Sequence, residues 1–362
     1  MATRIMVIKN RGLLLQETAL ARPDLLPIYA GSELVRVRAN RATEFFAGAP
    51  TGFAVFPVAD LGIPPLIQAE NLAALAPHLR GRKLVLLISS PGYVRKEGPQ
   101  RRAGYDGNFS RLHATAALTS LRLTPEIRRG FARRMRDYPG SLENDPLLDA
   151  TTATLADTTV AGAWAYALLW PLNQARLLLL RASDAARVIN ELRGHVPPRP
   201  APQPAPDWDE LLAHAESTYR ANSASNPFSF GDAWWTRYGA MLSRQQGRGS
   251  DSGFAAHMAD SPWWRDLELG LATLRAEGAR PLVLNIPLAG TFLTYAGVSP
   301  AARAAYYDRL HRLSERYGFP VVDLREHDQD RLFLSDQDGH PSPAGWVHLD
   351  RMINAFYHDS LR

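Results

Sequence analysis

The stretch LLPIYAGSEL at residues 25–34 decides the fold prediction. Its first six residues are a continuous apolar run, which is typical of a strand buried on both faces of a parallel sheet. Gly31 and Ser32 follow where this strand ends. Because α/β proteins bind ligands at the carboxyl edge of a parallel sheet, these two residues lie where a functional site is expected. The stretch therefore predicts a parallel α/β sheet with a candidate site at its edge.

Further apolar runs extend the predicted sheet, and helical patterns alternate with them. We predict additional strands at residues 52–58, 83–89, 281–288 and 320–324. Helices that begin with proline, which is favoured at the first helical position, are predicted at residues 64–79, 300–317 and 343–361. A helix between two parallel strands supplies the crossover that such a pair needs. We therefore expect an α/β fold with a flavodoxin-like parallel sheet and helices on both faces.

The middle of the chain differs from both ends. Residues 112–192 lack strand patterns and carry long helical ones. We predict a single domain over residues 1–362, in which a mostly helical insertion at 112–279 separates core segments at 20–111 and 280–362. Residues 196–206, VPPRPAPQPAP, contain six prolines and predict an extended strap within the insertion.

Residues 161–172, AGAWAYALLWPL, are an uninterrupted run of apolar or small side chains inside the insertion. Twelve residues are too few for a helix that spans a bilayer. Two interpretations remain open. The run belongs to a helix buried within the insertion, which we favour, or to a surface that docks a membrane or a membrane-bound partner.

Composition excludes several classes of protein. The chain has 362 residues, with 41 Lys and Arg against 36 Asp and Glu, and no cysteine. The absence of cysteine excludes disulfides, cysteine-ligated metal sites and thiol nucleophiles. Basic residues are scattered among acidic ones without interleaved aromatic residues, so we expect no nucleic-acid partner. Residues 1–16 carry neither a signal-peptide pattern nor an apolar run long enough for a membrane anchor.

A second candidate element, DQDGHP at residues 336–341, lies just before the last predicted helix. A histidine beside a carboxylate is the arrangement that activates a serine nucleophile. We therefore predict Ser32 as a nucleophile, His340 as its general base, and an aspartate that orients His340. Asp338 is the first choice, because residues two apart in an extended loop share a face, whereas Asp336 needs a tight turn to reach the histidine.

Other interpretations of these residues stay open. Asp336, Asp338 and His340 could hold a metal ion, or the loop could be an ordinary surface turn. Ser32 could likewise be a turn or helix-cap serine. Because no matching ligand cluster stands out elsewhere in the sequence, we predict no metal site.

Ordered sequence blocks run along most of the chain. They are Gly31-Ser32-Glu33, Ser90-Pro91-Gly92-Tyr93 with Lys96, Phe109-Ser110, Asn226-Pro227-Phe228, Ile286-Pro287 with Gly290 and Tyr295-Ala296-Gly297, His340, and Gly345-Trp346. In this order they resemble the DltD family of D-alanyl transfer proteins, which act in teichoic-acid D-alanylation. The resemblance implies the SGNH (GDSL-type) hydrolase fold for the core.

The resemblance also implies an activity: an extracytoplasmic serine acyltransferase or esterase that acts on D-alanyl esters without a cofactor. Ser32 would accept the D-alanyl group and pass it to a hydroxyl of a teichoic-acid-like or other envelope polymer. The backbone of Ser32, with Gly62 and Gly92, would form the oxyanion site. Glu33 and Tyr93 would bind substrate, and Glu33 is a candidate for recognising the ammonium group of D-alanine.

The partners implied in the same way are a D-alanyl donor, the acceptor polymer and a membrane-bound acyltransferase. Members of the family carry an N-terminal membrane anchor, so the resemblance implies that this protein is anchored at the outer face of the membrane by an N-terminal segment that is absent from this chain.

The chain departs from the family pattern at two places. Gln337 stands at the family's acid position, three residues before the histidine, and Ser90 and Gly92 stand where SGNH hydrolases carry an oxyanion asparagine. Two alternatives therefore remain. The same site could serve an O-acetyltransferase or esterase acting on an exopolysaccharide, or the chain could be a noncatalytic scaffold that docks a carrier or a membrane-bound acyltransferase.

Overall fold

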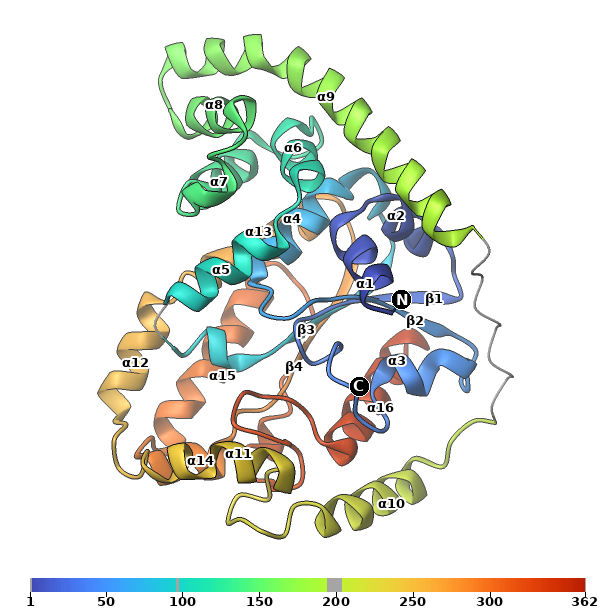
Figure 1. Ribbon diagram of the computed structural model, residues 1–362, viewed down its shortest axis with the longest axis vertical. Coiled ribbons are helices and arrows are strands. Elements are labelled where there is room, and N and C mark those ends of the chain that lie inside the picture. The colour runs from blue at the N-terminus through green and yellow to red at the C-terminus, as the bar shows by residue number, and fades with distance from the viewer. Residues whose placement is uncertain (1, 96–97, 194–203, 362) are drawn as a thin grey trace.

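A five-stranded sheet organises the computed structural model, which describes residues 2–95, 98–193 and 204–361 (Figure 1). The strands are β1 (Leu25–Tyr29), β2 (Ala54–Val58), β3 (Lys83–Ile88), β4 (Arg280–Asn285) and β5 (Val321–Val322). They lie in the order β2-β1-β3-β4-β5, and every neighbouring pair is parallel. This is the flavodoxin-like order, in which ligands bind where the strand order reverses. The predicted fold class, an SGNH-like α/β fold, is confirmed.

Helices cover both faces of the sheet, because side chains along each strand alternate between two apolar clusters. In β3, Leu84 and Leu86 join one cluster, whereas Val85 and Leu87 join the other. The first face packs against α2 (Leu14–Ala21), α4 (Pro65–Ala74), α13 (Trp263–Ala276) and α15 (Pro300–Arg316). The second face packs against α3 (Ala42–Phe45) and α16 (Pro343–Tyr357).

The described residues between 112 and 279 form helices. They are α6 (Arg111–Thr119), α7 (Pro125–Met135), α8 (Pro146–Ala156), α9 (Val160–Leu192), α10 (Trp208–Ala221), α11 (Asp232–Ser243), α12 (Asp251–Asp260) and α13. Helices α6, α7 and α8 bury a separate apolar cluster against α4, with Phe131 and Leu118 at its centre. The division into one core and one insertion stays a prediction.

Three α-helices of the described chain remain. They are α1 (Ala2–Arg11), α5 (Pro99–Asn108) and α14 (Gly290–Ala296). Among the described helices, none combines the length and the apolarity needed to cross a membrane. Most of the strap predicted at 196–206 lies outside the described residues.

The apolar run at 161–172 is part of α9, a 33-residue helix at the outer edge of the molecule (Figure 1). Its inner face packs against α6 and α8: Asn173 is buried, and the Trp170 indole donates a hydrogen bond to the carbonyl of Thr119. The opposite face, which we call the α9 outer face, is exposed and consists of Val160, Trp164, Leu168, Leu172, Leu178 and Leu179. The favoured interpretation, a buried helix, is therefore wrong for this face, where Leu168 is 77% exposed.

Candidate active site

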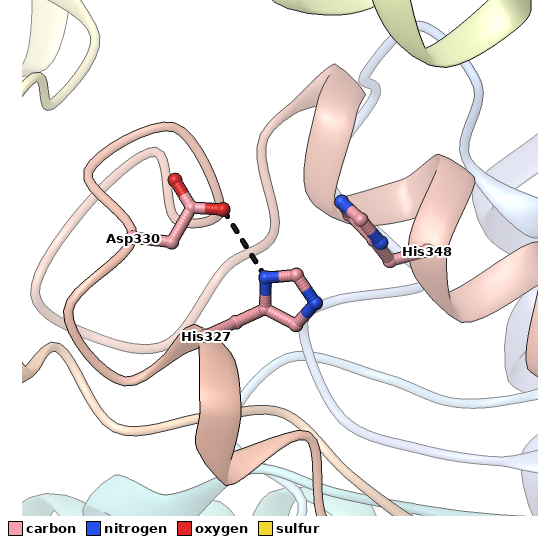
Figure 2. Close-up of side chains that lie close together, drawn as sticks. All are labelled: His327, Asp330 and His348. Carbon is pink, nitrogen blue, oxygen red and sulfur yellow. Dashed lines mark hydrogen bonds and ion pairs between the residues drawn. The ribbon is translucent and has the colours of Figure 1, made fainter. Parts of the chain in front are cut away.

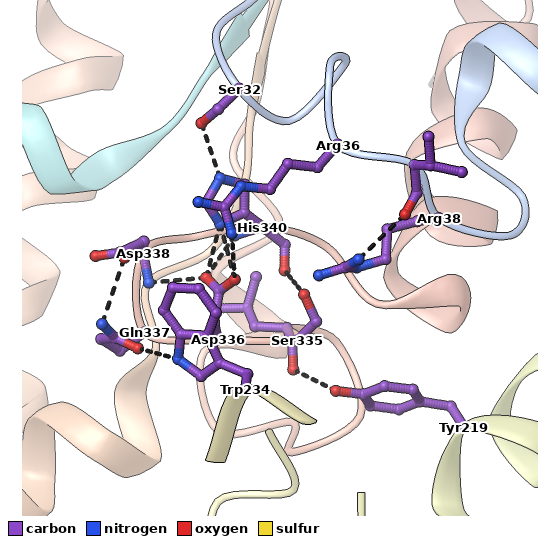
Figure 3. Close-up of polar contacts among 12 residues, drawn as sticks. Ser32, Arg36, Arg38, Tyr219, Trp234, Ser335, Asp336, Gln337, Asp338 and His340 are labelled. Atoms are coloured by element: carbon purple, nitrogen blue, oxygen red, sulfur yellow. Dashed lines mark hydrogen bonds and ion pairs between the residues drawn. The ribbon is translucent and has the colours of Figure 1, made fainter. Parts of the chain in front are cut away.

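Ser32 lies at the carboxyl edge of the sheet, three residues after β1 ends. Its carbonyl accepts hydrogen bonds from the amides of Val35 and Arg36, so the chain makes a tight turn directly after the strand. This turn directs the hydroxyl toward the loop before α16, and Ser32 Oγ lies 2.8 Å from His340 Nε2 (Figure 3). The structure thus brings together two residues that are 308 positions apart in the sequence.

The other ring nitrogen of His340 contacts Asp336. His340 Nδ1 lies 2.8 Å and 2.9 Å from the two carboxylate oxygens of Asp336, and both side chains are buried. Asp338, the first choice from the sequence, instead forms an ion pair with Arg95 at 2.9 Å. The prediction that Asp338 contacts His340 is therefore wrong, and Asp336 completes the hydrogen-bonded chain.

The tight turn that Asp336 needs is built by Asp336 itself. Its Oδ1 accepts hydrogen bonds from the amides of Asp338 and His340, at 2.9 Å and 3.3 Å. Gly339 has φ +82°, a conformation that glycine adopts without strain. This side-chain-to-backbone turn folds the loop back, so that a residue four positions away reaches the imidazole.

A small cavity of about 120 Å³ opens beside Ser32. Besides Ser32, its lining includes the predicted oxyanion glycines, Gly62 and Gly92, and the predicted substrate-binding residues, Glu33 and Tyr93. Drug-sized ligands occupy pockets of roughly 300–1,000 Å³, so this cavity matches a group of only a few heavy atoms. The size fits a small acyl group.

The cavity wall offers backbone donors close to Ser32. The amides of Ser32 and Gly62 donate no hydrogen bond to any residue that the structure describes. At Gly92 a Cβ atom would lie only 1.6 Å from the ring of Trp263, so glycine is required there. Burial, together with the carboxylates of Asp266 and Glu33, raises the pKa of Tyr93 well above its usual value, and its phenol stays protonated.

Comparison with known proteins identifies the family. The model of the family described as "DltD protein" matches residues 2–358, which is nearly the whole chain. The chain belongs to the DltD family. It is 27% identical to Protein DltD of Bacillus subtilis (strain 168) over 349 residues, covering 96% of this chain and 86% of that protein. It is 24% identical to Protein DltD of Staphylococcus aureus (strain NCTC 8325 / PS 47), covering 95% and 83%. DltD family proteins are involved in D-alanylation of teichoic acids.

Sequence reasoning missed several residues around the site of this DltD family member. Arg36 Nη1 lies 3.8 Å from Asp336 Oδ2, and its guanidinium stacks over the ring of Trp234 (Figure 3). The Trp234 indole donates to the Gln337 side chain at 2.8 Å, and the Tyr219 hydroxyl donates to the carbonyl of Leu334. Helices α10 and α11 therefore brace the loop that carries Asp336 and His340. Nothing in the local sequence around Tyr219 or Trp234 signals this contact.

A separate cluster of potential metal ligands was also missed. His327, Asp330 and His348 present ligand atoms that all lie within 4.8 Å of one another (Figure 2). Its members are separated along the chain, because His327 and Asp330 precede the loop that carries Asp336 and His340, whereas His348 follows that loop on α16. The prediction of no metal site stays a prediction.

Proposed function

We propose that this chain is an extracytoplasmic serine acyltransferase that moves D-alanyl groups onto hydroxyls of a teichoic-acid-like or other envelope polymer. One observation carries the proposal: the hydrogen-bonded chain from Ser32 through His340 to Asp336, at the mouth of a small cavity. A buried carboxylate that fixes a histidine against a serine hydroxyl is the arrangement of serine acyl-transfer enzymes. Membership of the DltD family supports D-alanine as the acyl group.

The reaction would proceed through an acyl-enzyme. Ser32 Oγ attacks the carbonyl carbon of a D-alanyl ester or thioester while His340 Nε2 takes the hydroxyl proton, and Asp336 stabilises the imidazolium. The C–O or C–S bond of the donor then breaks, and the leaving group takes the proton from His340. In the second half, His340 removes the proton from the acceptor hydroxyl, whose oxygen attacks the acyl carbon. The bond between that carbon and Ser32 Oγ then breaks as the new ester forms, and His340 returns the proton to Ser32 Oγ.

The free backbone amides support the same proposal. The tetrahedral intermediate carries negative charge on the former carbonyl oxygen, and the amides of Ser32 and Gly62 are available to donate to it. Glu33 lines the cavity, where one carboxylate oxygen accepts from the amide of Gly31 at 2.9 Å. Its negative charge favours a substrate with an ammonium group, such as D-alanyl, over a neutral acetyl group.

The proposal is tested by mass spectrometry of the full chain after incubation with a D-alanyl thioester and, in parallel, with a serine-directed fluorophosphonate. We expect one added group per chain, located on the peptide that contains Ser32. Ser32→Ala should take no label, and His340→Ala should label at least about a hundredfold more slowly, because the general base is lost.

Ser89→Ala is the matched control, since Ser89 is a second hydroxyl on the wall of the same cavity. It should label as the parent does. Labelling of the parent by neither reagent, or equal labelling of Ser32→Ala, would refute the acyl-enzyme and favour a noncatalytic scaffold. Faster acylation by an acetyl than by a D-alanyl thioester would favour the O-acetyl alternative.

We propose that the partner is a membrane-embedded donor of the D-alanyl group. The α9 outer face would then contact the lipid bilayer. The face runs along a helix about 50 Å long, and residues 160–175 contain no charged side chain. An exposed apolar helix face of this length is typical of helices that lie in a membrane interface.

Co-sedimentation with vesicles of phosphatidylcholine and phosphatidylglycerol tests this orientation. We expect the parent to bind, and Leu168→Glu combined with Leu178→Glu to reduce the bound fraction at least about tenfold, because charges at the apolar boundary are costly. Leu121→Glu is the control, since Leu121 is equally exposed but lies outside α9. Failure of the parent to bind vesicles, or equal loss in the control, would contradict a lipid contact and favour a protein partner.

A further inference from the structure

Two histidines and an aspartate meet where α16 packs beside the loop that follows β5. His327 ends a short 3-10 helix, Asp330 lies three residues further along the loop, and His348 lies in the second turn of α16 (Figure 2). All three side chains are partly buried, and their ligand atoms lie within 4.8 Å of one another. We propose that His327, Asp330 and His348 bind one divalent transition-metal ion.

The donor set indicates which ion would bind. Two imidazole nitrogens and one carboxylate oxygen suit Zn²⁺, which takes histidine and carboxylate ligands in tetrahedral sites and leaves a fourth position for water. Ca²⁺ and Mg²⁺ prefer six or more oxygen ligands and match this set poorly. Zn²⁺ is therefore the probe that the site should bind, and Co²⁺ should bind in the same geometry with a visible spectrum.

The ligands are oriented by their surroundings. Asp330 Oδ1 accepts a hydrogen bond from the amide of Leu332 at 2.8 Å, which turns Oδ2 toward His327 Nδ1 at 3.2 Å. The two imidazole rings lie 4.2 Å apart between centroids, and both pack against the buried ring of Phe333. Metal sites gain affinity from such supporting contacts, because they fix the ligands before the ion arrives.

Neighbouring charges are balanced around the cluster. Burial lowers the pKa of His348; among the neighbouring charges, Glu216 on α10 raises this pKa and Arg351 on α16 lowers it. Arg351 forms an ion pair with Asp209 at 3.1 Å, and Glu216 forms one with Arg220 at 3.3 Å. Asp330 is therefore the acidic ligand that would offset the charge of the ion.

A bound ion would connect two parts of the chain that flank the candidate active site. His327 and Asp330 precede Asp336 in the sequence. His348 lies on α16, which begins after His340. The ion would therefore brace the base of the loop that presents His340 to Ser32. This inference does not rest on the proposed acyltransferase function, and a site that binds metal remains even if Ser32 proves unreactive.

The test uses the full chain without a histidine tag, stripped of metal by a chelator and titrated with Zn²⁺ in a calorimeter. We expect one ion per chain, a rise of the thermal midpoint with Zn²⁺ but not with Mg²⁺, and d–d absorption bands with Co²⁺. His348→Ala should weaken Zn²⁺ binding more than about tenfold and remove the midpoint shift. Asp330→Asn, which keeps an oxygen for the amide of Leu332, should do the same if His348→Ala fails to fold.

His311→Ala is the matched control, because His311 forms a similar histidine–aspartate pair with Asp323 at 2.8 Å but belongs to no such cluster among the described residues. Its Zn²⁺ affinity should equal that of the parent. The inference would be overturned if the parent bound no Zn²⁺, or if folded His348→Ala or Asp330→Asn bound it as tightly as the parent. Equal weakening in His311→Ala would also overturn it, since binding would then be a general property of surface histidines.

Discussion

Asp336→Asn is expected to slow acylation of Ser32 by about 10³–10⁴-fold, the loss seen when the acid of a serine–histidine–aspartate triad is replaced. Both carboxylate oxygens of Asp336 lie within 2.9 Å of His340 Nδ1, and the side chain is fully buried. Asparagine retains an oxygen that can accept from the amides of Asp338 and His340, so the turn should persist. It carries no charge to stabilise the imidazolium, and the rate should fall for that reason.

Asp338→Asn is the matched comparison, because it makes the same chemical change two residues away. Asp338 pairs with Arg95 near the surface, and exposed ion pairs contribute about 1 kcal/mol or less, so the rate should change by no more than about fivefold. The rate of fluorophosphonate labelling measures both variants, and circular dichroism confirms that each is folded. A large loss in Asp338→Asn with normal labelling in Asp336→Asn would reverse the assignment of the orienting carboxylate.

The sequence was sufficient to predict the sheet and the meeting of Ser32 with His340. Strands buried on both faces appear in the sequence as short apolar runs. Because the strands are parallel, the residues that follow each run lie at the carboxyl edge of the sheet. The short strand β5 was harder, since only Val321 and Val322 of the predicted residues 320–324 pair with β4. A residue at the end of β1 and a residue before the last helix could therefore be placed together without coordinates.

The sequence could not show which aspartate contacts His340, because that contact depends on the conformation of a local turn. Spacing alone favoured Asp338, whereas hydrogen bonds from backbone amides to the side chain of Asp336 curl the loop in the other direction. Local bonds of this kind compete with extended structure. A carboxylate followed by glycine and histidine is compatible with both arrangements.

Contacts between distant helices were also beyond the sequence. Helix α13 supplies Trp263 to the cavity, and α11 supplies Trp234 to the loop that carries Asp336 and His340, although both residues lie far from Ser32 along the chain. Apolar content likewise favoured burial of residues 161–172, but a helix has two faces, and only packing decides which of them meets solvent. Contacts between distant helices produce no periodic pattern in the sequence, so they could not be predicted from it.

Helix α7 is joined by a buried ion pair to α13, the helix that carries Trp263 of the cavity wall, and loss of this pair should destabilise the fold strongly. Arg134 on α7 donates to Asp266 on α13 at 2.6 Å and 3.1 Å, and both side chains are almost fully buried. Burial alone would lower the pKa of Arg134, but the hydrogen bonds and charge of Asp266 outweigh it and raise the pKa above its usual value. Asp266 lies one helical turn after Trp263, so the pair holds the helix that forms the wall.

Asp266→Ala leaves a buried guanidinium without its main partner, and we expect a loss of about 3–5 kcal/mol in the free energy of unfolding, measured by urea denaturation. Asp149→Ala is the comparison, because Asp149 forms an exposed pair with Arg136 at 3.1 Å, and its loss should cost less than about 1 kcal/mol. Arg134→Met combined with Asp266→Leu should recover much of the lost stability, since apolar pairs can replace buried ion pairs. Equal effects of Asp266→Ala and Asp149→Ala would show that the pair does not anchor α13, and the cavity wall would then depend on apolar packing alone.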